Sequence, residues 1–153
     1  MRIEEFLKPE AVILQLAAQS KPEVLRELSR TLAKANPAVS ADKVGEALFA
    51  REKIYSTGIG EGVAIPHGKL TGLQGLSASF GVARAGIDFD SIDKKPTYLF
   101  FALVSPENSA GLHLKALARI SRLFKNPSFR ESIIQADSVE AIYALITQED
   151  AKV

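Results

Sequence analysis

Three short apolar segments along the chain have the length and composition of β-strands. Residues 11–16, "AVILQL", form a partly β-branched apolar run, and residues 76–83, "LSASFGVA", alternate in part between apolar and polar side chains. Residues 97–104, "TYLFFALV", are apolar at nearly every position. Such a run is typical of a strand that other elements cover on both faces, so we predict that 97–104 lies at the centre of a sheet.

Apolar residues at helical spacing predict five further segments, which are residues 20–37, 40–55, 107–127, 129–136 and 137–148. Asn-Pro pairs at 36–37 and 126–127 are expected to end the first and the third of these helices. The faces that we expect to be buried carry Val24, Leu25, Leu28 and Leu32 in the first helix, and Val44, Leu48 and Phe49 in the second.

Two of the helices begin with a recognisable capping pattern. Ser20 and Glu23 have the spacing of a capping box, and Pro22 lies in the first turn, where its missing N–H costs nothing. Asp137 and Glu140 repeat the capping-box spacing at the start of the last helix. Ser40 is the expected N-cap of the second helix.

Helices and strands alternate irregularly, and the chain has no internal repeat, low-complexity tract or linker. We therefore predict a single domain over residues 1–153, of the α/β class, in which helices cover a mixed sheet. A chain of 153 residues is long enough to bury about two-thirds of the surface that it exposes when unfolded.

The composition removes several classes of function. Hydrophobic residues make up 46% of the chain and charged residues 24%, and the net charge is +1 without a long block of either sign. This balance argues against nucleic acid as the main partner, because phosphate binding requires a concentrated basic face. Since the chain has no cysteine, disulfides, thiolate catalysis and cysteine-based metal sites are excluded.

The N-terminus "MRIEEFLKPE" has no apolar core suited to a signal peptide. No uncharged stretch reaches the roughly eighteen apolar residues that a membrane helix requires. We therefore expect a cytoplasmic protein.

The glycine-rich segment at residues 56–62 predicts a tightly folded loop. Gly58, Gly60 and Gly62 alternate with single residues, and glycine permits backbone angles that other residues avoid. Successive backbone N–H groups in such a loop can converge on an anion, although an ordinary tight turn explains the glycines equally well. The spacing matches neither a Walker A loop nor a dinucleotide-binding fingerprint.

One of the two histidines of the chain follows this loop. Residues 63–65 are suited to a short strand, and Pro66 then restricts the chain direction, so that His67 stands at the end of rigid backbone. An imidazole held in this way presents one neutral ring nitrogen to an incoming group as a nucleophile. A half-buried structural histidine is the alternative, and the residues alone leave both interpretations open.

The other histidine, His113, lies in the first turn of the third predicted helix and shares its inward face with Leu117, Ile120 and Phe124. It is either a histidine at the edge of the core or a hydrogen-bond donor near a helix N-terminus, where the dipole favours an anion. Two distant histidines and a carboxylate can also share a zinc ion, although the chain has no HExxH or other close metal-ligand spacing.

Three cationic residues flank the glycine segment and His67. Arg51 and Lys53 end the helix that leads into the glycines, and Lys69 follows His67. They are either favourable charges at a helix C-terminus and on the surface, or a positive ring around an oxyanion. In the second case the fork of arginine suits phosphate oxygens.

Residues 50–70, "AREKIYSTGIGEGVAIPHGKL", resemble the phosphorylation-site signature of the enzyme IIA domains of the bacterial phosphoenolpyruvate-dependent phosphotransferase system, fructose/mannitol class. The stretch "STGIGEGVAIPHGK" is most similar to the nitrogen-regulatory branch of that class. "FDSIDKKPTYLFFALVSPE" and "HLKALARISRLF" follow in the expected order, so the resemblance covers nearly the whole chain. It implies a three-layer α/β fold in which helices flank a mixed sheet on both faces.

The resemblance also implies roles for individual residues. His67 falls on the phosphorylated histidine, His113 on the second active-site histidine, and Arg51 on the arginine sixteen residues before the phosphorylated histidine. We predict that His113 and Arg51 stabilise the phosphoryl group, with Ser56, Thr57 and loop N–H groups as helpers.

The reaction implied by the resemblance requires no metal, nucleotide or other cofactor, because the phosphoryl donor is another phosphoprotein, a histidine phosphocarrier of the NPr or HPr type. No IIB or membrane IIC segment accompanies the domain, so we expect a stand-alone, phosphorylation-dependent regulator of the nitrogen and potassium metabolism type. Two alternatives stay open. One is a sugar-transport IIA domain that passes phosphate to a fructose- or mannitol-type IIB domain, and the other is a non-catalytic regulatory binding module.

Overall fold

The predicted central strand lies in the middle of the sheet. In the computed structural model, which describes all 153 residues, β6 (Thr97–Pro106) pairs antiparallel with β5 (Ser77–Ile87) and parallel with β3 (Val63–Ala64) and β4 (His67–Leu70). At the two edges, β1 (Val12–Ile13) is parallel to β5, and β2 (Gly58–Gly60) is antiparallel to β3. The result is a mixed six-stranded sheet in the order β1-β5-β6-β3-β2, in which β4 also pairs with β6.

Successive side chains of β6 point to opposite faces of the sheet, and both faces are covered. The two core clusters contain alternate residues of this strand, with Leu99, Phe101 and Leu103 in one and Phe100, Ala102 and Val104 in the other. All six are at most 1% exposed. This burial on both faces explains why the segment is apolar without interruption.

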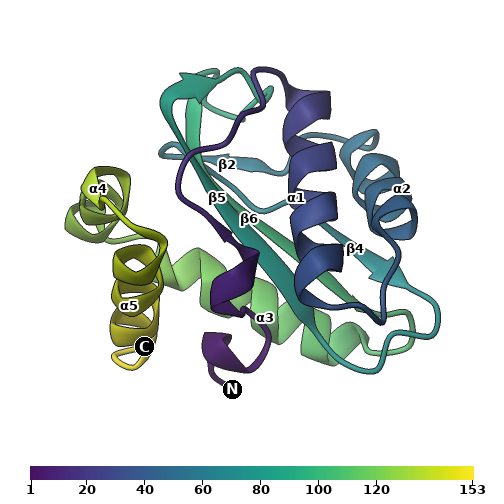
Figure 1. Ribbon diagram of the computed structural model, residues 1–153. Coiled ribbons are helices and arrows are strands. Elements are labelled where there is room, and N and C mark those ends of the chain that lie inside the picture. Colours follow the sequence, from purple (N-terminus) through teal and green to yellow (C-terminus); the bar gives the residue numbers. More distant parts are fainter.

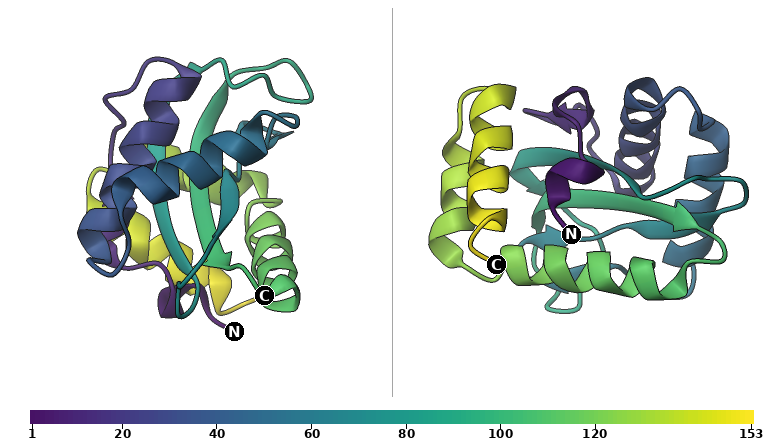
Figure 2. Two further views of the ribbon diagram at one scale, coloured as in Figure 1. Left: turned by 90° about the vertical axis from the view of Figure 1, so that its right-hand side faces the viewer. Right: turned by 90° about the horizontal axis from the view of Figure 1, so that it is seen from below.

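Five α-helices cover the two faces, which confirms the predicted three-layer α/β class (Figure 1). One face packs against α1 (Lys21–Ala35) and α2 (Ala41–Glu52), and the other against α3 (Ala110–Leu123), α4 (Pro127–Gln135) and α5 (Val139–Asp150). In the left view of Figure 2, α1 and α3 lie on opposite sides of the strands, and α2 crosses in front of them. Two short 3-10 turns, η1 (Ile3–Glu5) and η2 (Pro9–Ala11), precede β1 and pack on the side of α5.

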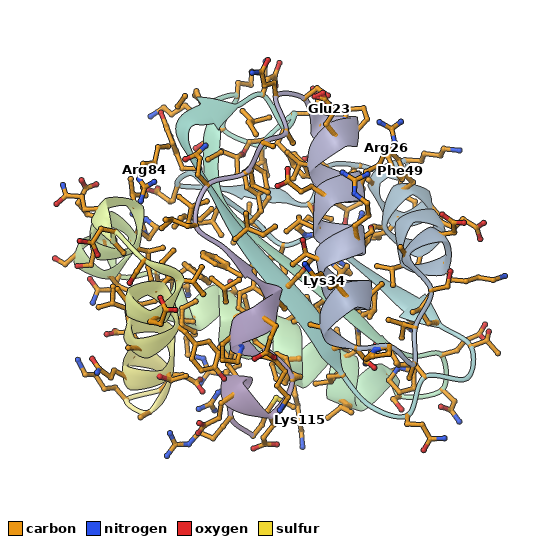
Figure 3. All side chains as sticks on the ribbon, viewed as in Figure 1. Glu23, Arg26, Lys34, Phe49, Arg84 and Lys115 are labelled. Atoms are coloured by element: carbon orange, nitrogen blue, oxygen red, sulfur yellow. The ribbon has the colours of Figure 1, made fainter.

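The predicted buried faces of the first two helices are largely confirmed. The four apolar positions predicted for α1 are at most 1% exposed, and Val44 and Leu48 of α2 are fully buried. Phe49 is only partly buried, because it packs at the rim of the core. There the guanidinium of Arg26 on α1 lies 5.8 Å from the centroid of its ring (Figure 3).

The first helix starts as predicted, but the capping box is shifted. The Ser20 hydroxyl accepts a hydrogen bond from the N–H of Glu23 at 3.4 Å. The Glu23 carboxylate, however, accepts from the N–H of Gln19 at 3.2 Å and not from that of Ser20.

The prediction for the cap of the last helix was wrong by one residue. The N-cap is Ser138, whose hydroxyl accepts from the N–H of Ala141 at 3.0 Å, so Asp137 and Glu140 do not form a capping box. Aspartate and serine are both good N-caps, and the two residues are adjacent. The backbone shows that Ser138 is the N-cap, because its carbonyl accepts the first helical hydrogen bond, from the N–H of Ile142.

Two further boundaries differ from the predictions. The strand predicted at 11–16 is reduced to Val12–Ile13. A 3-10 turn ends at Ala11, just before it. After it, the side chain of Gln15, and not a backbone carbonyl, accepts the hydrogen bond from the N–H of Arg84. The Asn126-Pro127 pair ends the third helix as expected, but it also begins the next one. Asn126 is the N-cap of α4 and Pro127 its first residue, where a missing N–H is tolerated.

Candidate active site

The glycine segment, predicted as a tightly folded loop, forms the turn of a β-hairpin. Gly60, Glu61 and Gly62 have φ values of 90°, 58° and 77°, and they turn the chain from β2 into β3. Only glycine adopts such angles readily, which explains two of the three glycines. The N–H of Glu61 donates to Asp93 Oδ2 at 3.1 Å and that of Gly58 to the Ser56 hydroxyl at 3.0 Å. These two N–H groups of the glycine segment are therefore bonded within the protein, and the prediction that N–H groups of this loop help to bind phosphate gains no support from them.

His67 is the first residue of β4, and its imidazole has one fixed orientation. Its Nδ1 lies 2.7 Å from the carbonyl oxygen of Ile65. Because a carbonyl oxygen only accepts, Nδ1 carries the proton in this bond and Nε2 keeps its lone pair. The carbonyl of Pro66 accepts from the N–H of Leu103 at 2.9 Å, which fixes the backbone before His67 to the central strand.

His113 lies beside His67, although the two are far apart in the sequence. The centroids of the two rings are 5.3 Å apart and the ring planes are inclined at 57°. His113 is 6% exposed; of the residues predicted to share its inward face, Ile120 and Phe124 are buried, and Leu117 is only partly buried. Its Nδ1 lies 2.5 Å from the hydroxyl of Ser105 on β6. A hydroxyl both donates and accepts, so this contact permits either tautomer of His113.

Both imidazoles are held neutral. Burial lowers the pKa of His67, and the nearby charge of Arg51 lowers it further, against the opposing effects of the Ile65 carbonyl and the Glu52 carboxylate. Burial lowers the pKa of His113 to about 4, with further contributions from His67 and Lys69. At pH 7 the site therefore presents two uncharged rings, and His67 has a free lone pair on Nε2.

Arg51 lies in the last turn of α2 and is partly exposed. One of its terminal nitrogens donates to the carbonyl of Tyr55 at 2.9 Å, and its guanidinium stacks over the Tyr55 ring at 4.7 Å from the centroid. The rings of His67 and His113 therefore lie side by side, and the charge of Arg51 is near enough to lower the pKa of His67, although the contacts of its guanidinium go to Tyr55. The roles of these three residues stay predictions.

The structure does not leave the side chains of Ser56 and Thr57 free for a ligand. The Ser56 hydroxyl donates to the carbonyl of Phe89 at 2.7 Å. The Thr57 hydroxyl donates to Glu52 Oε2 at 2.6 Å, and its N–H donates to Glu52 Oε1 at 2.8 Å. Their proposed contribution to phosphate binding stays a prediction that these contacts do not support.

Two residues of this region, Ser105 and Glu52, were not predicted from the sequence. Ser105 lies two residues after Leu103 and therefore on the same face of β6. The alternation of side chains along the strand could have placed it there from the sequence. Glu52 follows Val44 and Leu48 at intervals of four residues, which places a carboxylate on the buried face of α2. A charged residue at an inward helical position was therefore visible in the sequence.

The chain contains no group of three or more histidine, cysteine, aspartate or glutamate side chains arranged to hold a metal ion. None of its helices combines the length and the apolar character needed to cross a membrane.

The fold and the site first define a class, an α/β protein that presents one neutral imidazole nitrogen beside a second histidine and a positive charge. The family model described as "Phosphoenolpyruvate-dependent sugar phosphotransferase system, EIIA 2" matches residues 5–149, and the chain therefore belongs to this EIIA family. As a member it is a phosphotransferase component, which exchanges phosphoryl groups with other proteins of the system.

Individual relatives agree with this assignment. The chain is 38% identical over 146 residues to the nitrogen regulatory protein of Bradyrhizobium diazoefficiens, with 95% of each chain covered. It is 35% identical over 150 residues to the fructose-specific EIIABC component of Bacillus subtilis, where it spans 98% of its own length but only 24% of the relative. The crystal structure of the nitrogen regulatory protein IIA-Ntr from Neisseria meningitidis matches with a TM-score of 0.87 and 38% identity, covering 95% of this chain and 99% of that one. These similarities confirm the predicted family and its nitrogen-regulatory branch.

Proposed function

We propose that the chain is a phosphohistidine carrier with a regulatory role, and that it accepts a phosphoryl group on Nε2 of His67 from a histidine phosphocarrier of the NPr or HPr type. The observation that carries this proposal is the 2.7 Å contact between His67 Nδ1 and the Ile65 carbonyl. It keeps the proton on Nδ1 and leaves Nε2 as an unprotonated nucleophile.

The transfer requires no net proton movement. The Nε2 lone pair of His67 attacks the phosphorus in line, the new N–P bond forms as the donor's N–P bond breaks, and the bonding electron pair returns to the donor's histidine nitrogen. Nδ1 keeps its proton, and the Ile65 carbonyl stabilises the ring as it loses electron density. The protein's contribution is therefore mainly positioning and electrostatics.

Arg51 and His113 are suited to stabilise the transferred group. The phosphoryl group carries negative charge on three oxygens, and Arg51 supplies a nearby positive charge. When the Ser105 hydroxyl donates to His113 Nδ1, the proton of His113 is on Nε2, and that N–H is free to donate to a phosphoryl oxygen. His113 then acts as a neutral donor, in agreement with its low pKa.

Exposed apolar side chains adjoin the site and suit docking of a phosphocarrier protein. Ile54 and Tyr55 follow Arg51 in the chain and are each 70% exposed, and Leu114 follows His113 and is 66% exposed. Large exposed apolar side chains near a polar site are typical of protein–protein contact surfaces.

A regulatory role is supported by the 38% identity to a nitrogen regulatory protein over 95% of both chains. Phosphorylation adds nearly two negative charges at pH 7. Since the unmodified chain carries a net charge of +1, the modification reverses the sign of its charge. Target proteins that contact the surface around His67 will therefore distinguish the two states.

The test is a phosphorelay assay with phosphoenolpyruvate, enzyme I, the phosphocarrier and the purified chain. We expect an acid-labile label on the wild type and none on His67→Ala. His113→Ala should be labelled to the same final extent, but about 100-fold more slowly, because it loses a donor to the transition state. Lys115→Gln, an exposed position on the same helix (Figure 3), is the matched control and should leave the rate unchanged. An acid-stable label, or a label that survives His67→Ala, would overturn the proposal.

A second candidate function is that of a sugar-transport IIA domain. The 35% identity to part of a fructose-specific EIIABC component favours it. Mixing the phosphorylated chain with a fructose-type IIB domain separates the two functions. Rapid transfer to the IIB domain supports sugar transport, whereas retention of the label supports the regulatory role.

A further inference from the structure

A buried carboxylate lies behind the loop that leads to His67. Glu52 is the last residue of α2, and its side chain is only 4% exposed. Its Oε1 accepts from the Thr57 N–H at 2.8 Å and lies 3.0 Å from the Lys21 ammonium, and its Oε2 accepts from the Thr57 hydroxyl at 2.6 Å.

The position of Glu52 is unfavourable for a carboxylate unless other contacts compensate. Burial removes its hydration, and the C-terminal end of a helix repels negative charge. Glu52 is held in this place by three charge-assisted contacts, two of which go to a single residue, Thr57. The geometry of Thr57 is therefore the feature that Glu52 determines most directly.

Thr57 is connected to His67 through one residue, Ile65. The carbonyl of Thr57 accepts from the N–H of Ile65 at 3.0 Å, and the carbonyl of Ile65 lies 2.7 Å from His67 Nδ1. A displacement of Thr57 therefore moves the residue whose carbonyl sets the tautomer and the direction of the His67 ring.

The negative charge of Glu52 also acts on His67 directly. It opposes the effect of Arg51 and favours positive charge on the imidazole, although burial remains the larger influence on the pKa of His67. The His67 ring becomes more positive as Nε2 forms its bond to phosphorus. Glu52 thus favours the reacting ring by its charge as well as by its contacts.

We propose that Glu52 is a positioning residue for phosphoryl transfer, which fixes Thr57 and thereby keeps His67 in the Nδ1–H tautomer with Nε2 presented to the donor. This inference rests on the proposed function of His67. Glu52 touches neither the phosphoryl group nor the partner protein, and it acts through Thr57 and Ile65.

Glu52→Gln tests the proposal, because the amide keeps the size of the side chain and removes its charge. We expect kcat for phosphorylation by the phosphocarrier to fall between about tenfold and 100-fold, with KM for the phosphocarrier unchanged. Nitrogen chemical shifts of His67 should change from a single Nδ1–H form to a mixture of tautomers. Thr57→Val, which removes only the hydroxyl, should cause a smaller change in the same direction, and the double variant should be no slower than Glu52→Gln.

Glu27→Gln is the matched control. Glu27 is also a carboxylate that accepts two loop N–H groups, from Ala17 at 3.2 Å and Ala18 at 2.9 Å, but no hydrogen bond links that loop to His67. Its rate and the His67 tautomer should equal those of the wild type. Wild-type kcat together with a single Nδ1–H tautomer in Glu52→Gln would overturn the proposal. If the wild type itself takes no label on His67, the proposed function fails, and the tautomer measurement still decides whether Glu52 positions the ring.

Discussion

Two buried carboxylates in different parts of this protein have similar kinds of partner, a backbone N–H and a cationic side chain. Glu52 binds a backbone N–H, a hydroxyl and the ammonium of Lys21. Asp150, which is 1% exposed, accepts from the N–H of Ile3 at 2.7 Å and from Arg119 Nε at 2.5 Å. The two differ in what they join. Glu52 binds the N–H of a residue five positions away, and Asp150 binds one that is 147 positions away.

This difference separates positioning from stability. Asp150 holds the N-terminal turn, α3 and α5 together through these contacts. The two chain ends lie near each other in Figures 1 and 2. A contact between distant segments is lost as soon as the chain unfolds, and forming it closes a long loop. Glu52 orders the short loop between α2 and β2, so its effect falls on the geometry of that loop. The same chemistry therefore supports the fold in one place and the site in the other.

The largest expected effect is that of Asp150→Ala on stability. The substitution leaves the Arg119 guanidinium and the Ile3 N–H without their buried partner, so we expect the free energy of unfolding to fall by about 3–5 kcal/mol. Urea denaturation measures this loss. The rate of His67 phosphorylation, expressed per folded molecule, should stay unchanged. A slower phosphoryl transfer in the folded variant would contradict the idea that Asp150 supports only the stability of the fold.

Lys152→Gln is the control for Asp150→Ala. Lys152 pairs with Glu149 at 3.5 Å at the same end of the chain, but its side chain is 74% exposed. An exposed pair of this kind contributes little, so the midpoint of urea denaturation should hardly move.

The next effect is a pH dependence of the free energy of unfolding, which arises from His113 in the site and not from the contacts of Asp150. The pKa of His113 is about 4 in the folded protein and about 6.5 when unfolded, so the unfolded chain binds more protons between these values. The stability that the neutral His113 contributes is therefore fully present above pH 6.5, and it is lost as the pH falls towards 4. We expect about 1–2 kcal/mol less stability at pH 5 than at pH 7 from this residue.

His113→Gln tests this pH dependence. Urea denaturation at pH 7 and pH 5 should show a smaller difference for the variant than for the wild type, because glutamine does not titrate. His67, whose pKa is also lowered, contributes with the same sign and keeps part of the dependence in the variant. An identical pH dependence in both proteins would show that His113 is charged in the folded state near pH 5.

The smallest effect is that of Lys21→Met, which removes the cation beside Glu52. The Lys21 side chain is 19% exposed and also pairs with the exposed Asp90 at 3.3 Å, so water reaches it in the folded protein. Both hydrogen bonds from Thr57 to Glu52 remain. We expect a loss of about 1 kcal/mol in the free energy of unfolding, well below that of Asp150→Ala. An equal loss in the two variants would mean that the two carboxylates support the fold in the same way.

Much of the fold was predictable because it depends on local patterns. The apolar run at 97–104 indicated a strand covered on both faces, and the inward positions of α1 followed from helical spacing. The errors lie at element ends, where neighbouring residues compete. Ser138 caps the last helix in place of Asp137, and the strand predicted at 11–16 keeps only two residues because Gln15 bonds to Arg84 through its side chain.

The candidate site was predictable in its histidines but not in the groups that hold them. Pro66 before His67, and the place of His113 in the first turn of a helix, were visible in the sequence. The expectation that Thr57 faces a phosphate group did not allow for a buried carboxylate that takes both its N–H and its hydroxyl.

The sequence by itself determined the family, the α/β class, the central strand and the two histidines, because these depend on short motifs and on periodicity within a single segment. Only the tertiary structure decided that the rings of His67 and His113 lie 5.3 Å apart, that Ser105 holds His113, and that Glu52 binds Thr57. Each of these contacts depends on how separate elements pack. His67 meets His113 because β4 pairs with β6 in the register that sets His67 beside Leu103, and because α3 packs on that face of the sheet.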